Sequence, residues 1–175
     1  MSCADQLFEE LIEPIKSQMI ASVMRIVRDP HDAEDVMQEI LANIWRKLER
    51  IHKHPNAEAY IMRICINRSY DAMRRKSRLG KSALSLDSSQ MEQLPDPSVN
   101  DADATEREGA IHKALFSLPG RQGKALLLRV ADNKPYEAIA EILGCSAATA
   151  RSHVSKGRER LRTILEREEL IGEEA

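Results

Sequence analysis

The chain has 175 residues, of which 42% are hydrophobic, 31% charged and only 3% aromatic. This is a globular composition and excludes an intrinsically disordered chain. The net charge of −2 hides a strong separation of charge along the chain. Basic residues cluster at 63–81 and 151–162, and acidic residues at 29–39, 87–108 and 166–174. A chain with this pattern can bind nucleic acid locally while its overall charge stays close to zero.

The cysteines predict neither a disulfide framework nor a zinc site. Cys3, Cys65 and Cys145 are far apart in the sequence and odd in number. Cys65 and Cys145 lie in apolar helical patterns, so we expect buried structural thiols. The sequence shows no secretory signal and no apolar run long enough to span a membrane, which favours a cytoplasmic protein.

The first half of the chain predicts three helices. Strand-like alternation is absent and aromatic residues are rare, so we expect an all-α fold. A first amphipathic segment covers 7–28, where Pro14 either kinks the helix or starts a second one. A helix over 32–48 follows, with its first residue as the N-cap. A polar loop at 52–56 then leads to a long helix over 57–78.

The end of that long helix carries more basic residues than a helix terminus requires. The basic residues are Arg63, Arg68, Arg74, Arg75, Lys76, Arg78 and Lys81, and the only acidic residue set against them is Asp71. Complementing the helix dipole is the simpler interpretation. The size of the excess favours contact with phosphate groups instead.

A change of composition separates the chain into two small domains. Residues 81–103 are rich in Ser, Asp and Pro and lack periodicity, which predicts a flexible acidic linker. The linker follows a first domain at 1–80 and precedes a second at 104–168. Within the second domain we expect helices over 105–118 and 121–130, and an acidic tail follows at 169–175.

The second domain ends in a helix-turn-helix pattern. Pro135 can open the first helix, Gly144 can end it in a left-handed conformation, and Ser146 can cap the second. The second helix carries Arg, Ser and Lys near its start. Such side chains suit the major groove of DNA, where Arg and Lys bind guanine edges and phosphates. The alternative is a solvated basic face on a packing helix.

No catalytic or cofactor site is recognisable. The sequence contains no Gly-rich phosphate loop, no defensible nucleophile–base pair and no carboxylate cluster with metal spacing. His52 and His54 flank a loop at a spacing unsuited to one face of a helix, so we expect no metal. We therefore expect a protein that is not an enzyme and holds no cofactor.

Three segments in order give the chain a specific resemblance. They are DPHDAEDVMQEILANIWRKL, AYIMRICINRSYDAMRRKSR and LPGRQGKALLLRVADNKPYEAIAEILGCSAATARSHVSKGRERL. Together they resemble a bacterial RNA polymerase sigma factor of the extracytoplasmic-function group, also called group IV. The resemblance implies a subunit that binds core RNA polymerase and promoter DNA. The first domain would bind core polymerase and the minus-ten element, and the second the minus-thirty-five element.

The resemblance also implies roles for individual residues. Those on the face that docks to core polymerase are Asp32, Asp35, Gln38, Glu39 and Trp45. Those for minus-ten DNA are His52, His54, Tyr60, Arg63, Asn67, Arg68, Arg74 and Arg75. Those for minus-thirty-five DNA are Ser146, Thr149, Arg151, Ser152, Ser155, Lys156 and Arg158. The chain departs from the family where Tyr60 replaces a common Trp, where Ser155 replaces a bulkier residue and where His153 replaces an Arg.

Two other functions compete with the sigma factor hypothesis. A stand-alone helix-turn-helix regulator would bind duplex DNA without polymerase and would use its first domain for a partner or ligand. The basic end of the 57–78 helix argues against it, because such a regulator needs no second nucleic-acid surface. A nucleic-acid-processing enzyme would need the metal-binding carboxylates that the sequence lacks. The resemblance further implies control by an anti-sigma factor.

Overall fold

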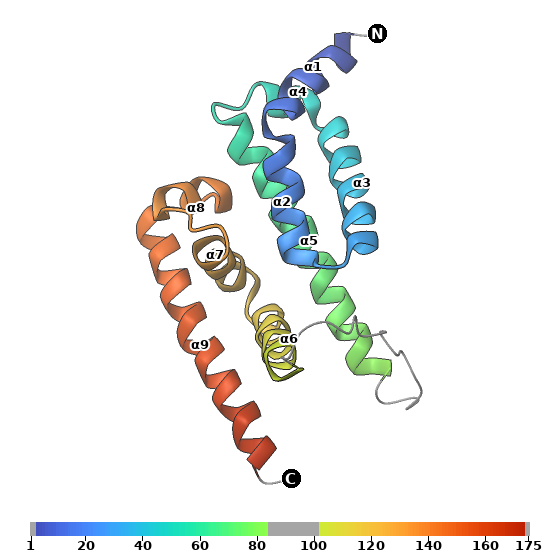
Figure 1. Cartoon of the computed structure of the whole chain (residues 1–175). Coiled ribbons are helices and arrows are strands. Elements are labelled where there is room, and N and C mark those ends of the chain that lie inside the picture. Colours follow the sequence, from blue (N-terminus) through green and yellow to red (C-terminus); the bar gives the residue numbers. More distant parts are fainter. Residues whose placement is uncertain (1–2, 84–101, 174–175) are drawn as a thin grey trace.

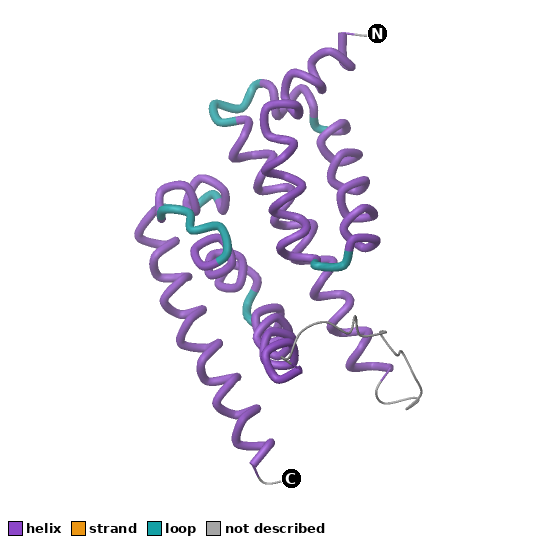
Figure 2. Tube along the Cα trace, in the orientation of Figure 1, coloured by secondary structure: helices purple, strands orange, loops and turns teal. Residues whose placement is uncertain are grey.

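The structure is a computed structural model that describes residues 3–83 and 102–173. All regular elements in these two ranges are helices, which confirms the all-α prediction (Figures 1 and 2). The first domain contains α1 (Cys3–Ile12), the 3₁₀ turn η1 (Glu13–Ile15), α2 (Lys16–Val27), α3 (Pro30–Arg46), α4 (Leu48–His52) and α5 (Ala57–Ala83). The second contains α6 (Ala102–Ser117), α7 (Gly120–Val130), α8 (Tyr136–Leu143) and α9 (Ala147–Glu173).

The first domain packs α2 and α3 against α5. Ile40, Ile44 and Ile61 are completely buried at the centre of this packing. The 3₁₀ turn contains Pro14, so the expected interruption of the first segment is a short tightened turn. Figure 1 shows α3 on the side of the domain that faces away from α7, α8 and α9.

Helix α3 begins earlier than the sequence pattern predicted. Its N-cap is Asp29, whose carboxylate accepts a hydrogen bond from the Asp32 N–H at 2.8 Å. Pro30 takes the first helical position, where its missing N–H costs nothing. The N–H of Asp32, together with Lys76 and His31, lowers the pKa of Asp29. The prediction that Asp32 is the N-cap was therefore wrong. Asp29 caps this helix and Pro30 is its first residue, whereas the sequence pattern placed both residues in a break before it.

Two helices extend beyond their predicted ends. α5 continues to Ala83 and α9 to Glu173, so residues 169–173, which were expected to form an acidic tail, are helical. Both extensions lack proline and are rich in good helix formers such as Ala, Leu, Lys and Glu. Most of the predicted linker, 84–101, lies outside the described residues.

Helix α8 ends and helix α9 begins at the predicted residues. Gly144 adopts φ of 65° and ψ of 50°, the left-handed conformation that ends α8. The Ser146 hydroxyl accepts a hydrogen bond from the Thr149 N–H at 3.1 Å and caps α9. Pro135 is the N-cap of α8, one position before the predicted one. Ile139 and Ala150 are completely buried and join the two helices to the core formed with α7.

Cys65 is expected to resist alkylation until the protein unfolds. Its side chain is fully buried in α5, and burial raises the pKa of its thiol to about 12. Because the thiolate is the reactive form, the folded chain presents almost none at pH 8. Mass spectrometry after iodoacetamide treatment should show slow labelling of Cys65 in buffer and fast labelling in guanidinium. The partly exposed Cys145 is the internal control, and equal rates for the two thiols in buffer would contradict the prediction.

Candidate functional site

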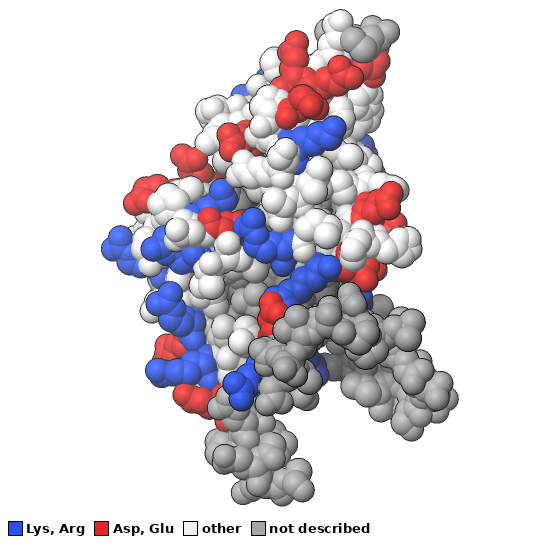
Figure 3. Space-filling view, viewed as in Figure 1, with Lys and Arg blue, Asp and Glu red and all other residues white. Residues whose placement is uncertain are grey.

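The side chains singled out on the helix-turn-helix share one exposed surface. All seven lie at the start of α9 or in the turn before it, and all are exposed: Ser146, Thr149, Arg151, Ser152, Ser155, Lys156 and Arg158. The Ser146 and Thr149 hydroxyls are hydrogen-bonded to each other at 2.8 Å. In the space-filling view, Lys and Arg side chains gather along the outer edge formed by this helix (Figure 3). The arrangement presents hydroxyl and guanidinium donors together on one helix face.

A second cluster surrounds the start of α5. Asn56 caps this helix by accepting a hydrogen bond from the Ala59 N–H at 2.9 Å, and its own N–H donates to His54 Nδ1 at 3.1 Å. The His54 and Tyr60 rings meet edge to face, with centroids 5.0 Å apart. The Arg63 guanidinium carbon lies 5.8 Å from the Tyr60 ring centroid. Asn56 thus orders the loop as the N-cap of α5. The sequence pattern placed this residue in a polar loop and did not indicate its capping role.

The second domain covers part of the predicted minus-ten surface. Here α5 and the end of α2 meet α6, α7 and α8, and we call this contact surface the seam. Arg63 donates to the Ile142 carbonyl at 2.6 Å and to the Glu141 carbonyl at 2.7 Å, at the C-terminus of α8. Lys124 of α7 donates to Asn67 Oδ1 at 2.8 Å. Two side chains that the resemblance gives to DNA are therefore already bound by the second domain.

Tyr70 anchors the seam and was absent from the sequence-based predictions. Its ring is completely buried and its hydroxyl lies 3.1 Å from the Leu115 carbonyl and 3.3 Å from the Leu118 carbonyl. Burial raises the pKa of this hydroxyl to about 12, so it stays protonated and donates. Gly123 of α7 lies directly against the ring. The apolar spacing with Ile66 could have indicated burial of Tyr70, although not its partners.

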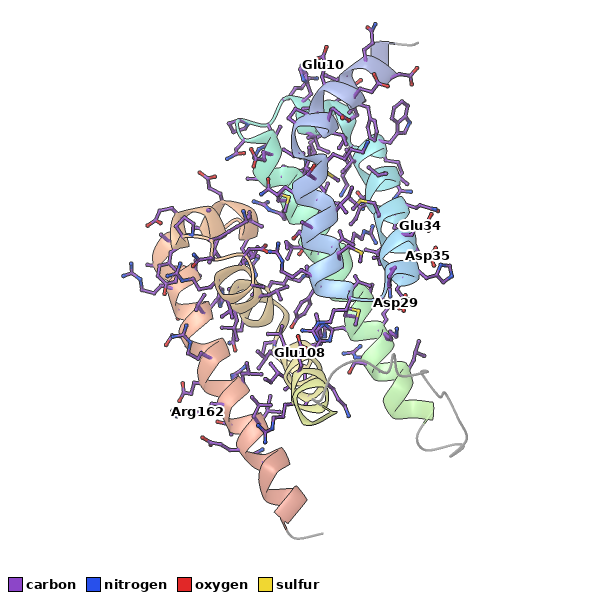
Figure 4. All side chains as sticks on the ribbon, viewed as in Figure 1. Glu10, Asp29, Glu34, Asp35, Glu108 and Arg162 are labelled. Atoms are coloured by element: carbon purple, nitrogen blue, oxygen red, sulfur yellow. The ribbon has the colours of Figure 1, made fainter. Side chains whose placement is uncertain are left out.

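Two ion pairs join the end of α2 to the second domain. Arg25 pairs with Asp132, and the Arg28 guanidinium lies 2.9 Å from Glu108. In Figure 4, Glu108 is labelled on α6, close to the lower end of the first domain. These pairs are partly exposed, so their contribution to stability is modest and falls with added salt.

His112 makes the stability of the seam depend on pH. Its Nε2 lies 2.9 Å from the Ile26 carbonyl. Burial lowers the pKa of His112 from 6.5; the hydrogen bond to Ile26 and the charge of Glu108 oppose this shift, and Arg28 adds to it. The unfolded chain then binds more protons than the folded chain below about pH 6.5. We expect the free energy of unfolding to fall as the pH drops from about 6.5 through the lowered pKa. Urea titrations at a series of pH values measure this, and His112→Gln should flatten the dependence. An unchanged pH profile in that variant would contradict the assignment.

The predicted polymerase-docking face lies on α3, away from the seam. In Figure 4, Glu34 and Asp35 project from α3 to the side opposite the second domain. Trp45 is 45% exposed and meets the Phe8 ring edge to face, with centroids 5.4 Å apart.

Asp32 and Glu39 are turned toward the basic end of α5, where Lys76 lies 2.6 Å from Asp32 and Arg75 lies 3.9 Å from Glu39. Gln38 is exposed on the same helix.

Comparisons with known proteins identify both domains. Residues 11–79 match the family model for Sigma-70 region 2, and residues 108–161 match that for Sigma-70 region 4. The RNA polymerase sigma-E factor of Streptomyces avermitilis is 30% identical over 164 residues, which cover 93% of this chain and 87% of the relative. The chain belongs to the RNA polymerase sigma factors. The sigma-E factor of Streptomyces coelicolor is 31% identical over 90% of this chain and 85% of the relative.

Further matches place this sigma factor in the extracytoplasmic-function group. The ECF sigma factor SigE of Mycolicibacterium smegmatis is 30% identical over 90% of this chain and 61% of the relative. The sigma factor RpoE of Bartonella quintana, solved in complex with the anti-sigma factor NepR, superposes with a TM-score of 0.54. It is 26% identical, and the match covers 91% of this chain and 96% of that chain. The sigma factor hypothesis is confirmed, and the stand-alone regulator is not favoured.

The described residues contain neither a metal site nor a membrane-spanning helix. Within residues 3–83 and 102–173, no group of His, Cys, Asp and Glu side chains is placed to hold a metal ion. No helix in the described part of the chain is long and apolar enough to cross a membrane.

Proposed function

We propose that the first domain of this sigma factor binds core polymerase and the minus-ten element, and that the second domain binds the minus-thirty-five element. The chain would act in the cytoplasm and perform no catalysis itself, since RNA synthesis belongs to the polymerase core. One observation carries the proposal more than any other. In the region 4 match, six of the seven predicted DNA-binding side chains lie on α9 and the seventh, Ser146, caps it, and all seven are exposed to solvent.

The chemistry of α9 fits duplex DNA. Arg151 and Lys156 can reach base edges or phosphates, and the N-terminus of a helix attracts a phosphate. Arg158 lies further along the helix, where a phosphate contact is expected. Because Ser155 and His153 differ from common family residues, this sigma factor is expected to prefer a minus-thirty-five sequence of its own.

The chemistry of α5 fits an unpaired strand. Tyr60 offers a flat ring on which a base can stack, and His52 and His54 offer further polar edges. Arg63, Arg68, Arg74 and Arg75 would bind phosphates, and Asn67 would contact a base of the minus-ten strand. Tyr in place of the common Trp reduces the stacking area, so strand melting should depend more on the promoter sequence.

The closed seam supports a regulatory step before promoter binding. In the closed seam, Arg63 Nε and Nη2 are bound to the carbonyls of Ile142 and Glu141, and Asn67 Oδ1 is bound to Lys124, so these groups are not available to DNA. Opening of the seam would release both side chains. An anti-sigma factor that stabilises the closed arrangement would keep the sigma factor inactive. The Bartonella sigma factor RpoE was solved in complex with an anti-sigma factor, NepR. Co-purification of a stoichiometric inhibitor from the native host would test this part of the proposal.

Run-off transcription tests the proposed function directly. Purified core polymerase is assayed with and without the full chain on fragments of the host genome. We expect discrete start sites that require both the chain and the core. Loss of these transcripts with Asn67→Ala would place the minus-ten contact on α5. Tight binding of duplex DNA by the chain alone, without any core-dependent transcript, would overturn the proposal.

A further inference from the structure

The aromatic ring at the start of α8 contacts arginines from both neighbouring helices. The guanidinium carbon of Arg129 lies over the Tyr136 ring, 5.0 Å from its centroid, and that of Arg151 lies over it at 5.1 Å. Arg129 comes from the last turn of α7, and Arg151 from the exposed start of α9. The ring itself is half-buried and packs against the core of the second domain. Its position is therefore fixed by the fold.

The two arginines differ in what else they bind. Arg129 is half-buried and donates a hydrogen bond to the Lys134 carbonyl at 3.0 Å, which fixes it as part of the α7–α8 connection. Arg151 is exposed and takes part in none of the ion pairs found among the described residues. The contact with the Tyr136 ring thus orients Arg151. The N–H groups of the Arg151 guanidinium remain available to bind DNA.

The ring also lies at the surface proposed to face DNA. Tyr136 and Arg151 line one surface groove together with Ser155 and Arg158, two other residues of the proposed minus-thirty-five set. A guanidinium that stacks on a ring through its flat face keeps its N–H fork free at the edge. That fork is the group that binds guanine O6 and N7 in a bidentate manner. Stacking also lowers the rotamer entropy that Arg151 loses when it binds a base.

We propose that Tyr136 is a positioning residue that holds Arg151 ready to read one base pair of the minus-thirty-five element. The proposal rests on the proposed function, which assigns α9 to that element. The face of the ring performs the role, so its hydroxyl group is dispensable. Tyr136 would affect sequence discrimination through Arg151 and would make no base contact of its own.

The test compares Tyr136→Leu, Tyr136→Phe and Arg151→Ala in the polymerase holoenzyme assembled with the full chain. A promoter found by run-off transcription is changed at each minus-thirty-five base pair in turn, and competition binding gives the preference at each position. Tyr136→Leu should weaken the preference by about two- to fivefold at the base pair that Arg151→Ala affects, in line with an exposed cation–π contact. Tyr136→Phe should retain the preference. In the Arg151→Ala background, Tyr136→Leu should change no preference further.

Several outcomes would overturn the proposal. A uniform loss of binding to all promoter variants with Tyr136→Leu, or a lower thermal midpoint with unchanged preference, would show a purely structural role. Additive effects of Tyr136→Leu and Arg151→Ala would show that the ring does not act through the arginine. Normal core-dependent transcription with unchanged base preference in all three variants would overturn this inference alone. Failure of the wild-type chain to yield any core-dependent transcript would overturn the proposed function, and this inference with it.

Discussion

Replacing Gly123 with alanine is expected to open the seam between the two domains. A Cβ at this position would overlap the Tyr70 hydroxyl and lie 2.7 Å from Cζ and 2.9 Å from Cε2 of the ring. Alanine inside a helix normally stabilises it by about 1 kcal/mol relative to glycine. Here the overlap costs about 1–3 kcal/mol, and displacing Tyr70 would leave two buried carbonyls without their donor at a further cost of about 1–3 kcal/mol. The closed arrangement should therefore lose about 1–5 kcal/mol.

Small-angle scattering and hydrogen exchange measure this effect. We expect a larger radius of gyration and faster exchange on the facing sides of α5 and α7, with helical content retained. Gly109→Ala in α6 is the matched control, because a Cβ placed there meets no atom within 4 Å beyond the neighbouring residues of its own helix. Tyr70→Ala in the same chain should remove most of the additional cost of Gly123→Ala. A Gly123→Ala chain as compact as the Gly109→Ala chain would refute the role given to this contact.

Replacing Trp45 with alanine is expected to weaken binding to core polymerase by about thirtyfold or more. Tryptophan is enriched among residues that contribute about 2 kcal/mol or more to protein interfaces. Trp45 is 45% exposed near the end of α3, so its indole is accessible in the closed chain. Competition for core polymerase against a labelled wild-type chain gives the change in Kd.

Two control variants separate docking from folding. Phe8→Ala removes the same edge-to-face contact with Trp45 but leaves the exposed part of the indole in place. Val130→Ala truncates another exposed apolar side chain, 66% exposed, at the end of α7 in the second domain. Equal losses in the Trp45→Ala and Phe8→Ala chains would assign the effect to packing of α1. Binding within twofold of wild type for Trp45→Ala would remove this residue from the docking face.

Features governed by neighbours in sequence could be predicted. The end of α8 at Gly144 and the cap at Ser146 depend on backbone groups within one helical turn, and the structure confirms both. Asp29 and Asp32 were harder to distinguish, because both are good caps three residues apart. Pro30 decides between them, since proline is favoured at the first position of a helix.

Features that depend on distant partners could not be predicted in the same way. Apolar spacing can indicate that Tyr70 is buried, but it cannot indicate that Leu115, Leu118 and Gly123 surround it. Lys124 and Asn67 are 57 positions apart, and each alone resembles an ordinary polar surface residue. The seam therefore became apparent only in three dimensions. The roles proposed for individual DNA- and polymerase-binding residues stay predictions until the variants above are measured.

The ion pairs between α3 and α5 affect how DNA binding should respond to salt. Each phosphate neutralised by a protein cation releases counterions from DNA, which gives a slope of about −0.7 in log K against log salt for single strands. Lys76 and Arg75 lie close to Asp32 and Glu39, so on moving to a phosphate each would leave a carboxylate that takes up a cation from solution. The uptake of cations by these carboxylates cancels part of the counterion release from DNA. The slope of log K against log salt should therefore be shallower than the number of basic side chains implies. Core polymerase that occupies Asp32 and Glu39 would remove the cancellation, and holoenzyme should then show the steeper salt dependence.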